Sequence, residues 1–183
     1  MTKEYDLLVV GEINPDLILD GDVLPEFGQV EKIVDQAKLT IGSSSAIFAA
    51  GAARLGLKTA FIGKCGDDTF GRFMLEEMEK RGIDVSPVLV LPGGSTGLSV
   101  ILNRGHDRAI LTHLGLIPAL SVEDIPRDLI ARSRHVHVAS YFLQTSLQPH
   151  LPEFFQTLRR QGITTSLDTN YDPTEKWEHF DEL

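Results

Sequence analysis

Hydrophobic and polar positions follow two different periods along this chain, and the period changes from one segment to the next. Short apolar stretches of the kind that form strands buried in a parallel sheet predict strands, and apolar residues at helical spacing predict helices. The predicted strands are 7–10, 60–62, 135–139 and 163–167, and the predicted helices are 44–55, 69–81 and about 149–161. Strands therefore alternate with helices over most of the chain.

Two segments break this order and have the alternation of antiparallel strands around polar turns. The first is a ribbon between residues 17 and 39, and the second runs from 88 to 114, with a hairpin turn at 104–107. We therefore predict a small antiparallel sheet, a β-lid, inserted into the α/β order at about 17–39 and 88–114.

Alternating β-α-β units form parallel sheets with right-handed crossovers and helices on both faces. The predicted fold is a three-layer, doubly wound, mostly parallel α/β sheet with a small antiparallel lid, in one domain over residues 1–183. Ligands of such sheets bind outside the carboxyl ends of the strands. The segments expected to meet there are 11–16, 42–45, 63–68, 140–144 and 168–172.

Charge and composition exclude several classes of partner. The 183 residues are 42% hydrophobic and carry a formal net charge of −9, which repels nucleic acid and anionic lipid. No segment approaches the roughly 20 apolar residues of a membrane span, and the charged first residues do not resemble a signal peptide. The single cysteine, Cys65, fits a reducing compartment, so we expect a cytoplasmic protein.

Asn14 and Asp16 follow the first predicted strand. An amide and a carboxylate at this point are suited to hydrogen bonds with neighbouring hydroxyls of a polyol, although Asn, Pro and Asp are also common turn formers. Ligand contact and a plain turn both remain open from these residues alone.

The turn Gly42-Ser43-Ser44 opens a helix built mostly from small residues. Its backbone N–H groups and the missing Cβ of Gly42 suit close approach of a ligand, whereas a serine N-cap would have the same pattern. Gln144, after the strand at 135–139, is a further candidate for substrate contact. His135 and His137 share one face of that strand, but no third ligand has matching spacing, so we predict no metal site.

Two motifs resemble the ribokinase-like (PfkB) carbohydrate kinases. They are the glycine–serine turn with its small-residue helix, GSSSAIFAAGAARLG at 42–56, and the turn GKCGDDTFG at 63–71. The resemblance implies an ATP- and Mg²⁺-dependent kinase that phosphorylates a hydroxyl of a sugar or related polyol. It implies that Asp16 and Asn14 contact the sugar hydroxyls. It also implies that Gly42, Ser43 and Ser44 correspond to the di-glycine motif of the sugar site. Ser43 replaces the second glycine and Ile47 the usual asparagine, which leaves the substrate open.

The segment 166–173 resembles the Asp-x-Asn-x-Arg motif of the sugar-acid and fructose kinase branches. The resemblance implies that Asp168 and Asn170 contact the metal–nucleotide side of the site. Asp172 stands where an arginine is often found, which speaks against an anionic group held there.

The family's remaining motifs do not occur in this sequence. They are an Asn-x-x-Glu metal motif and a Gly-x-Gly-Asp turn that supplies the anion hole and the catalytic base. We therefore assign no catalytic residue and expect the sugar-binding half of a kinase, a fragment inactive alone, that dimerises through the β-lid or an uncovered sheet face. The alternatives are a non-catalytic sugar-binding or interaction module and a fragment of a nucleoside kinase of the adenosine type.

Overall fold

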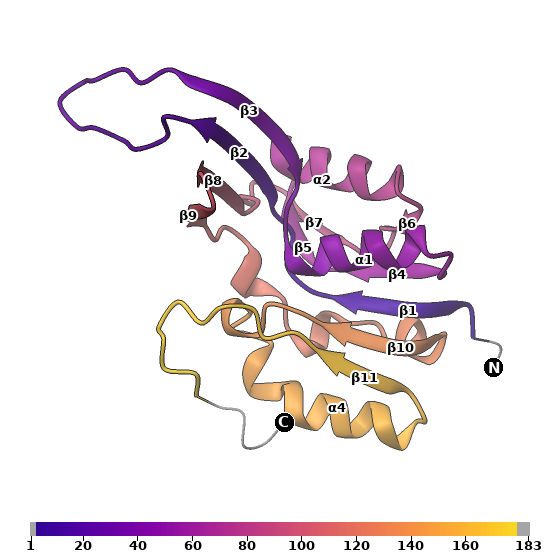
Figure 1. Ribbon diagram of the computed structural model, residues 1–183. Coiled ribbons are helices and arrows are strands. Elements are labelled where there is room, and N and C mark those ends of the chain that lie inside the picture. The colour runs from indigo at the N-terminus through magenta and orange to yellow at the C-terminus, as the bar shows by residue number, and fades with distance from the viewer. Residues whose placement is uncertain (1–2, 179–183) are drawn as a thin grey trace.

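A five-stranded parallel sheet forms the centre of the molecule. The structure is a computed structural model that describes residues 3–178. The strand order is β11-β10-β1-β4-β6, and every neighbouring pair is parallel. The strands are β1 Tyr5–Val10, β4 Thr59–Ile62, β6 Ile83–Asp84, β10 Ser133–Val138 and β11 Thr164–Leu167. The arrowheads of β1, β10 and β11 point toward the same side of the molecule (Figure 1).

Helices cover both faces of this sheet. The helices α1 (Ser44–Arg54) and α2 (Thr69–Glu79) lie on one face, and α3 (Arg127–Ala131) and α4 (Leu151–Arg160) pack on the other (Figure 1). Because successive side chains of a strand point to opposite faces, β1 contributes to both interiors. Leu7 and Val9 pack toward α1 and α2, while Leu8 and Val10 pack toward α3 and α4. The three-layer, mostly parallel prediction is confirmed.

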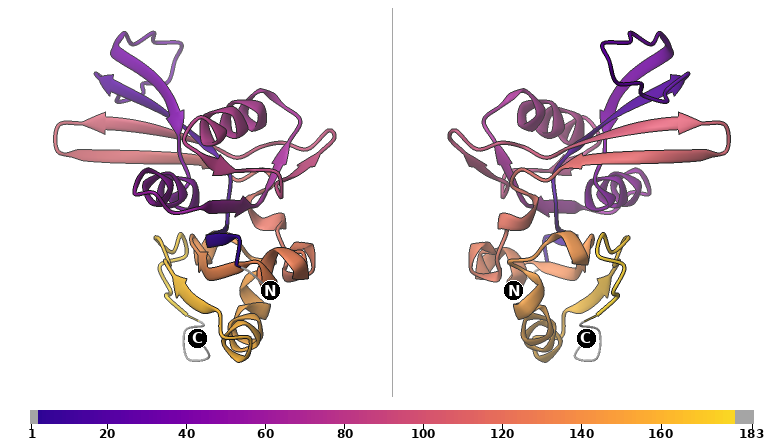
Figure 2. Two further views of the ribbon diagram at one scale, coloured as in Figure 1. Left: turned by 90° about the vertical axis from the view of Figure 1, so that its right-hand side faces the viewer. Right: turned by 90° about the vertical axis from the view of Figure 1, so that its left-hand side faces the viewer.

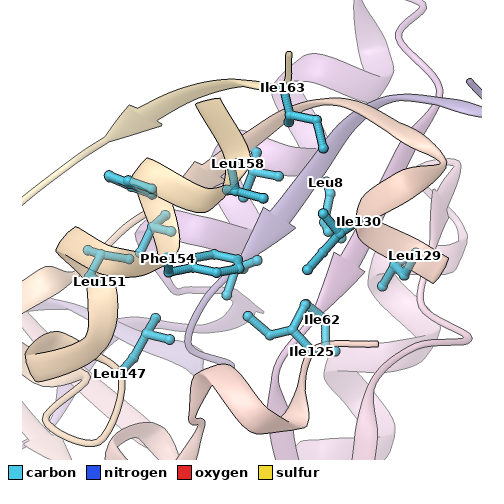
Figure 3. Packing of buried hydrophobic residues seen from close by; sticks show 14 of the residues in the cluster. Leu8, Ile62, Ile125, Leu129, Ile130, Leu147, Leu151, Phe154, Leu158 and Ile163 are labelled. Carbon is cyan, nitrogen blue, oxygen red and sulfur yellow. The ribbon is translucent and has the colours of Figure 1, made fainter. Parts of the chain in front are cut away.

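The interior between the sheet, α3 and α4 is the larger apolar cluster. Figure 3 shows Phe154 and Leu158 of α4 pointing toward Leu8 and Ile62 of the sheet, with Ile130 of α3 beside them. The opposite interior contains the small α1 residues Ala46, Ala49 and Ala52, which let this helix lie close to the sheet. Short 3-10 turns connect the larger elements, at Ile117–Ala119, Val122–Asp124, Tyr141–Leu143 and Gln148–His150.

A second, four-stranded sheet projects from the body as two hairpins (Figure 2). Its strands are β2 Pro15–Gly21, β3 Val34–Ile41, β8 Leu98–Arg104 and β9 Asp107–His113, in the order β3-β2-β8-β9. The hairpins β2–β3 and β8–β9 are antiparallel, and parallel pairing of β2 with β8 joins them. β8 and β9 lie within the predicted lid segment 88–114, and β2 and β3 extend two residues beyond the predicted segment 17–39 at either end.

One strand expected in the lid belongs elsewhere. β7 (Leu89–Leu91) pairs with the short β5 (Lys64–Gly66) in a separate two-stranded sheet. The backbone N–H of Leu89 donates to the Gly63 carbonyl, 2.9 Å away, just past the end of β4. The segment is therefore held beside the body soon after it leaves β6, and it does not reach the lid.

Over residues 3–178, the structure contains no helix with the length and apolar character needed to cross a membrane.

Candidate functional site

Glu12 lies two residues past β1 and is only 3% exposed, which is unusual for an acidic side chain. Its Oε1 accepts hydrogen bonds from the Ser44 hydroxyl (3.1 Å) and the Ser45 backbone N–H (3.3 Å). The Ser43 hydroxyl also donates to Glu12, with the backbone carbonyl oxygen 2.7 Å away and Oε1 3.0 Å away. Oε2 accepts a very short bond from the Ser45 hydroxyl. The first turn of α1 therefore surrounds this carboxylate with donors.

Local backbone geometry makes this contact possible. A Cβ on Gly11 would lie 1.9 Å from the Ser45 hydroxyl oxygen, so only glycine lets α1 begin this close to β1. Ser43 is the N-cap of α1, and its hydroxyl accepts from the Ala46 N–H at 3.0 Å. Ser43 adopts a positive φ of 64°, which is uncommon for a residue with a side chain. Its strained backbone is held by the bonds from its hydroxyl to Glu12 and from the Ala46 N–H to that hydroxyl.

The same network reaches the ends of two further strands. Ser140, two residues past β10 and 1% exposed, donates to Glu12 Oε1 at 2.9 Å and lies 2.8 Å from the Ser44 hydroxyl. The Asn170 side-chain amide, in the loop after β11, donates to the Ser140 hydroxyl at 3.1 Å. The carboxyl ends of β1, β10 and β11 thus meet the N-terminus of α1 in one hydrogen-bonded cluster, which we call the Glu12 cluster (Glu12, Ser43, Ser44, Ser45, Ser140 and Asn170).

Asp16 lies beside this cluster, on the first strand of the lid. A Cβ on Gly42 would lie 2.1 Å from Asp16 Oδ1, so the missing side chain admits the Asp16 carboxylate. Burial raises the pKa of Asp16 above its ordinary value, and the positive charge of Arg108 only partly opposes this. The sequence predicted a close approach at Gly42, and the group that approaches is a carboxylate of the same chain.

A polar row crosses the base of the lid at Asp16. The pairing register places Thr40, Asp16, Ser99 and Thr112 side by side on β3, β2, β8 and β9. Asn14 donates to the Ser99 hydroxyl at 3.3 Å, and that hydroxyl lies 3.0 Å from the Thr112 hydroxyl. The next row, Leu39, Leu17, Val100 and Leu111, points to the opposite face of the lid and is apolar.

Most of the side chains singled out from the sequence come together here. Asn14, Asp16 and Gly42 meet at the base of the lid, Ser43 and Ser44 bind Glu12, and Asn170 binds Ser140.

Two candidates have other surroundings. Gln144 is 1% exposed and donates to the Ala139 carbonyl inside the fold. Asp168 is exposed and accepts from the Asn170 N–H at 3.0 Å, which closes a local turn. Substrate contact by Gln144 and cofactor contact by Asp168 remain predictions, and no contact with the Glu12 cluster supports the first.

The turn at 63–68 and the later Asp172 have structural roles. Asp68 is the N-cap of α2 and accepts from the Gly71 N–H at 2.8 Å. Asp172 is buried and accepts from the backbone N–H groups of Thr174 and Trp177, both at 2.8 Å. Burial acts to raise the pKa of Asp172, but these hydrogen bonds dominate and hold it below the ordinary value. Its carboxylate therefore organises its own loop.

The two histidines of β10 form a polar face on the α1 side of the sheet. His135 and His137 each lie 2.7 Å from the Ser166 hydroxyl, and the Phe48 ring stacks on His137 at 3.8 Å. Burial and the neighbouring His135 lower the pKa of His137 to about 4. Within residues 3–178, no group of three or more His, Cys, Asp or Glu side chains is arranged to hold a metal ion.

Sequence reasoning missed Glu12, the centre of the cluster. The signal was an acidic residue two positions after a continuous apolar strand, at a point where parallel sheets bind ligands. The large hollow of about 810 Å³ in the surface lies elsewhere, between α3 and α4, where Ile125, Ile130 and Phe154 are among its lining residues. It shares no residue with the Glu12 cluster.

Known proteins match this chain over nearly its whole length. The 5-dehydro-2-deoxygluconokinase of Geobacillus thermodenitrificans is 33% identical over 178 residues, covering 93% of this chain and 51% of the relative. A PfkB protein from Polaromonas sp. JS666 has the same fold, with a TM-score of 0.79 at 24% identity, over 93% of this chain and 57% of that one. A putative ribokinase II from E. coli, solved with ATP and Mg²⁺, has a TM-score of 0.75 at 21% identity, over 93% and 53%.

This chain spans about half the length of the curated relatives that it matches. The sequence profile described as "pfkB family carbohydrate kinase" matches residues 5–182. The chain belongs to the pfkB family of carbohydrate kinases.

Proposed function

We propose that this chain is the sugar-binding part of an ATP-dependent kinase that phosphorylates a hydroxyl of a sugar or related polyol. The observation that carries the proposal is the position of the Asp16 carboxylate, which belongs to the polar row of the lid and lies against Gly42, next to the Ser43–Ser44 turn of α1. Asp16 is partly buried, and this partial loss of hydration raises its pKa. Sugar hydroxyls would replace the lost water by donating to it.

The chemistry around Asp16 suits neutral hydroxyl donors. Carboxylate oxygens only accept hydrogen bonds, and serine and threonine hydroxyls both accept and donate. Asp16, Ser44 and Thr112 together offer this combination where the lid meets the sheet. The lid hairpins would close over a bound sugar and exclude water, which favours transfer to the sugar over hydrolysis.

The phosphoryl donor that we propose is ATP with Mg²⁺, as in the E. coli neighbour that was solved with both. The described residues do not by themselves form a site for a metal-bound triphosphate. Asp168 is exposed, and the Asp172 carboxylate already accepts hydrogen bonds from Thr174 and Trp177. Residues 3–178 contain no cluster of three metal ligands. We therefore expect this chain alone to bind sugar without phosphorylating it.

Calorimetric titration of the chain with a panel of sugars tests the proposal. The panel contains 5-dehydro-2-deoxygluconate, D-fructose, D-ribose and adenosine, each with and without ATP and Mg²⁺. We expect saturable binding of at least one sugar, and a loss of at least about tenfold in affinity in Asp16→Asn, because a hydrogen bond to a charged group contributes about 1.5–3 kcal/mol. Asp35→Asn, at an exposed position of the same lid hairpin, is the matched control.

The other functions predict different results from the same titrations. Binding of adenosine in preference to every sugar would favour a nucleoside kinase. Sugar binding by a natural protein that ends at Leu183 would favour a non-catalytic binding module. Absence of binding by every compound, in a folded chain, would contradict the proposal.

We also propose that the chain forms homodimers through the apolar face of the lid, the alternative surface being the polar face of β10 and β11. The row Leu39, Leu17, Val100 and Leu111 crosses all four lid strands, and Leu111 is 60% exposed. Burial of this row against a second copy would remove apolar surface from water.

A further inference from the structure

The N-terminus of α1 has the properties of an anion site. Unpaired N–H groups and the helix dipole at such an end favour a negative charge, and phosphate or carboxylate groups of ligands often occupy it. Here Glu12 of the same chain supplies that charge. The Ser45 N–H donates to Glu12, and the Ala46 N–H donates to the Ser43 hydroxyl. These donors are therefore satisfied within the chain.

The Glu12 carboxylate is stabilised by hydrogen-bond donors, and no cation neutralises it among the described residues. Across residues 3–178, none of the ion pairs formed by lysine or arginine side chains includes Glu12. Hydroxyl and backbone N–H donors surround it, and it is almost completely buried. A second anion brought to the turn would meet an uncompensated negative charge in surroundings that screen it weakly.

The Ser44 hydroxyl can accept a further hydrogen bond in each possible arrangement of the hydroxyl protons. Ser140 accepts from Asn170 and has one proton, which it donates either to Glu12, 2.9 Å away, or to the Ser44 hydroxyl, 2.8 Å away. Ser44 donates its own proton either to Ser140 or to Glu12, 3.1 Å away. In each arrangement Ser44, which is only half-buried, keeps at least one lone pair free to accept.

We propose that Glu12 is a specificity-determining residue that keeps anionic groups away from the N-terminus of α1 and makes Ser44 an acceptor for substrate hydroxyls. The inference rests on the proposed function, because it assigns the orientation of the sugar at the same site. A neutral, hydroxyl-bearing part of the substrate lies toward Ser44 and Asp16, and any acid or phosphate group of the substrate lies away from them.

Anion binding to a Glu12→Ala variant tests this assignment. The substitution removes the carboxylate and leaves the donors of α1 in place. The probe is inorganic phosphate, followed by the amide NMR signals of Ser44, Ser45 and Ala46. We expect these signals to shift with saturation in Glu12→Ala, with an affinity at least about tenfold higher than in the wild type, because a nearby like charge has been removed.

The matched control is Glu79→Ala, at an exposed position of α2, which changes the net charge by the same amount. It should respond to phosphate as the wild type does. If Glu12 has only a structural role, Glu12→Ala should change the melting temperature without creating an anion site. Equal phosphate affinity in the wild type and in a folded Glu12→Ala variant would overturn the proposal.

If the amide spectrum of Glu12→Ala shows an unfolded chain, Glu12→Gln decides the question with the same probe. It keeps the shape of the side chain and removes its charge, so an unchanged response to phosphate overturns the proposal. Titration of the wild type with D-sorbitol distinguishes failure of this inference from failure of the proposed function. If D-sorbitol does not bind and phosphate gives the expected result, sugar binding is contradicted, and the role of Glu12 in excluding anions is supported.

Discussion

Gly42→Ala should destabilise the protein because the site has no room for one methyl group. The new Cβ would lie 2.1 Å from Asp16 Oδ1, 2.5 Å from Asp16 Cγ and 2.8 Å from the Asn14 carbonyl oxygen. Since overpacking of this kind costs about 1–3 kcal/mol, we expect the free energy of unfolding to fall by that amount. Displacement of the Asp16 carboxylate should also weaken sugar binding.

A glycine-to-alanine substitution at Gly51 should have the opposite effect on the free energy of unfolding. Gly51 lies inside α1, and a Cβ there would meet no atom within 4 Å. Gly51→Ala should therefore raise the free energy of unfolding by about 0.5–1 kcal/mol, through helix propensity. Urea unfolding of both variants measures the two values, which should differ by about 1.5–4 kcal/mol.

A double-mutant cycle separates the clash with Asp16 from other effects. In an Asp16→Ala background the two shortest contacts disappear and the contact with the Asn14 carbonyl remains. The cost of Gly42→Ala should therefore be smaller in that background, though not zero. A cost that does not depend on Asp16, or a Gly42→Ala variant as stable as Gly51→Ala, would refute the reasoning.

Four further outcomes are expected. Sugar affinity should fall on acidification with a midpoint above the ordinary pKa of aspartate, because burial raises the pKa of Asp16 and the ionised form accepts the hydroxyls; calorimetry at a series of pH values would contradict this by a midpoint at or below about 3.9. His137 should stay neutral down to about pH 4 in NMR titrations, so its contribution to stability is complete above the unfolded pKa of about 6.5 and is lost as the pH falls toward 4; a midpoint near 6.5 in the folded protein would be the contrary result. Leu158→Ala, in the core under α4, should lower the free energy of unfolding by about 2–5 kcal/mol in urea, and a loss below 1 kcal/mol would count against the packing described. Leu111→Glu should convert a wild-type dimer to a monomer in sedimentation velocity, and an unchanged dimer would exclude the lid face as the interface.

The fold was predictable because its signals are local in the sequence. The apolar run at 7–10 and the helical spacing at 44–55 correspond to β1 and to α1, which ends one residue earlier. The position of β7 was not predictable in this way. Its residues alternate like those of a lid strand, and its partner is decided by the Leu89 contact with Gly63 beside β4.

The site was predictable only as a region. The rule that ligands bind at the carboxyl ends of parallel strands brought Asp16, Ser44 and Asn170 together correctly. Glu12, the centre of the cluster, was missed, and its bond to Ser140 joins residues 128 positions apart, which no local pattern encodes.

Gln144 shows the converse. Gln144 follows the end of a strand, where a ligand contact is expected. However, Ser140 has a left-handed backbone and a 3-10 turn follows at Tyr141–Leu143. The Gln144 amide therefore donates to the Ala139 carbonyl inside the fold.

Mapping polyol binding residue by residue tests the central claim most directly. In amide NMR spectra of the chain titrated with D-fructose and with 5-dehydro-2-deoxygluconate, the account predicts saturable shifts at Asp16, Ser44 and Ser140 for at least one of the two. Asp16→Asn should abolish these shifts. Shifts confined to the hollow between α3 and α4, or shifts that persist unchanged in Asp16→Asn, would contradict the assignment of the sugar site.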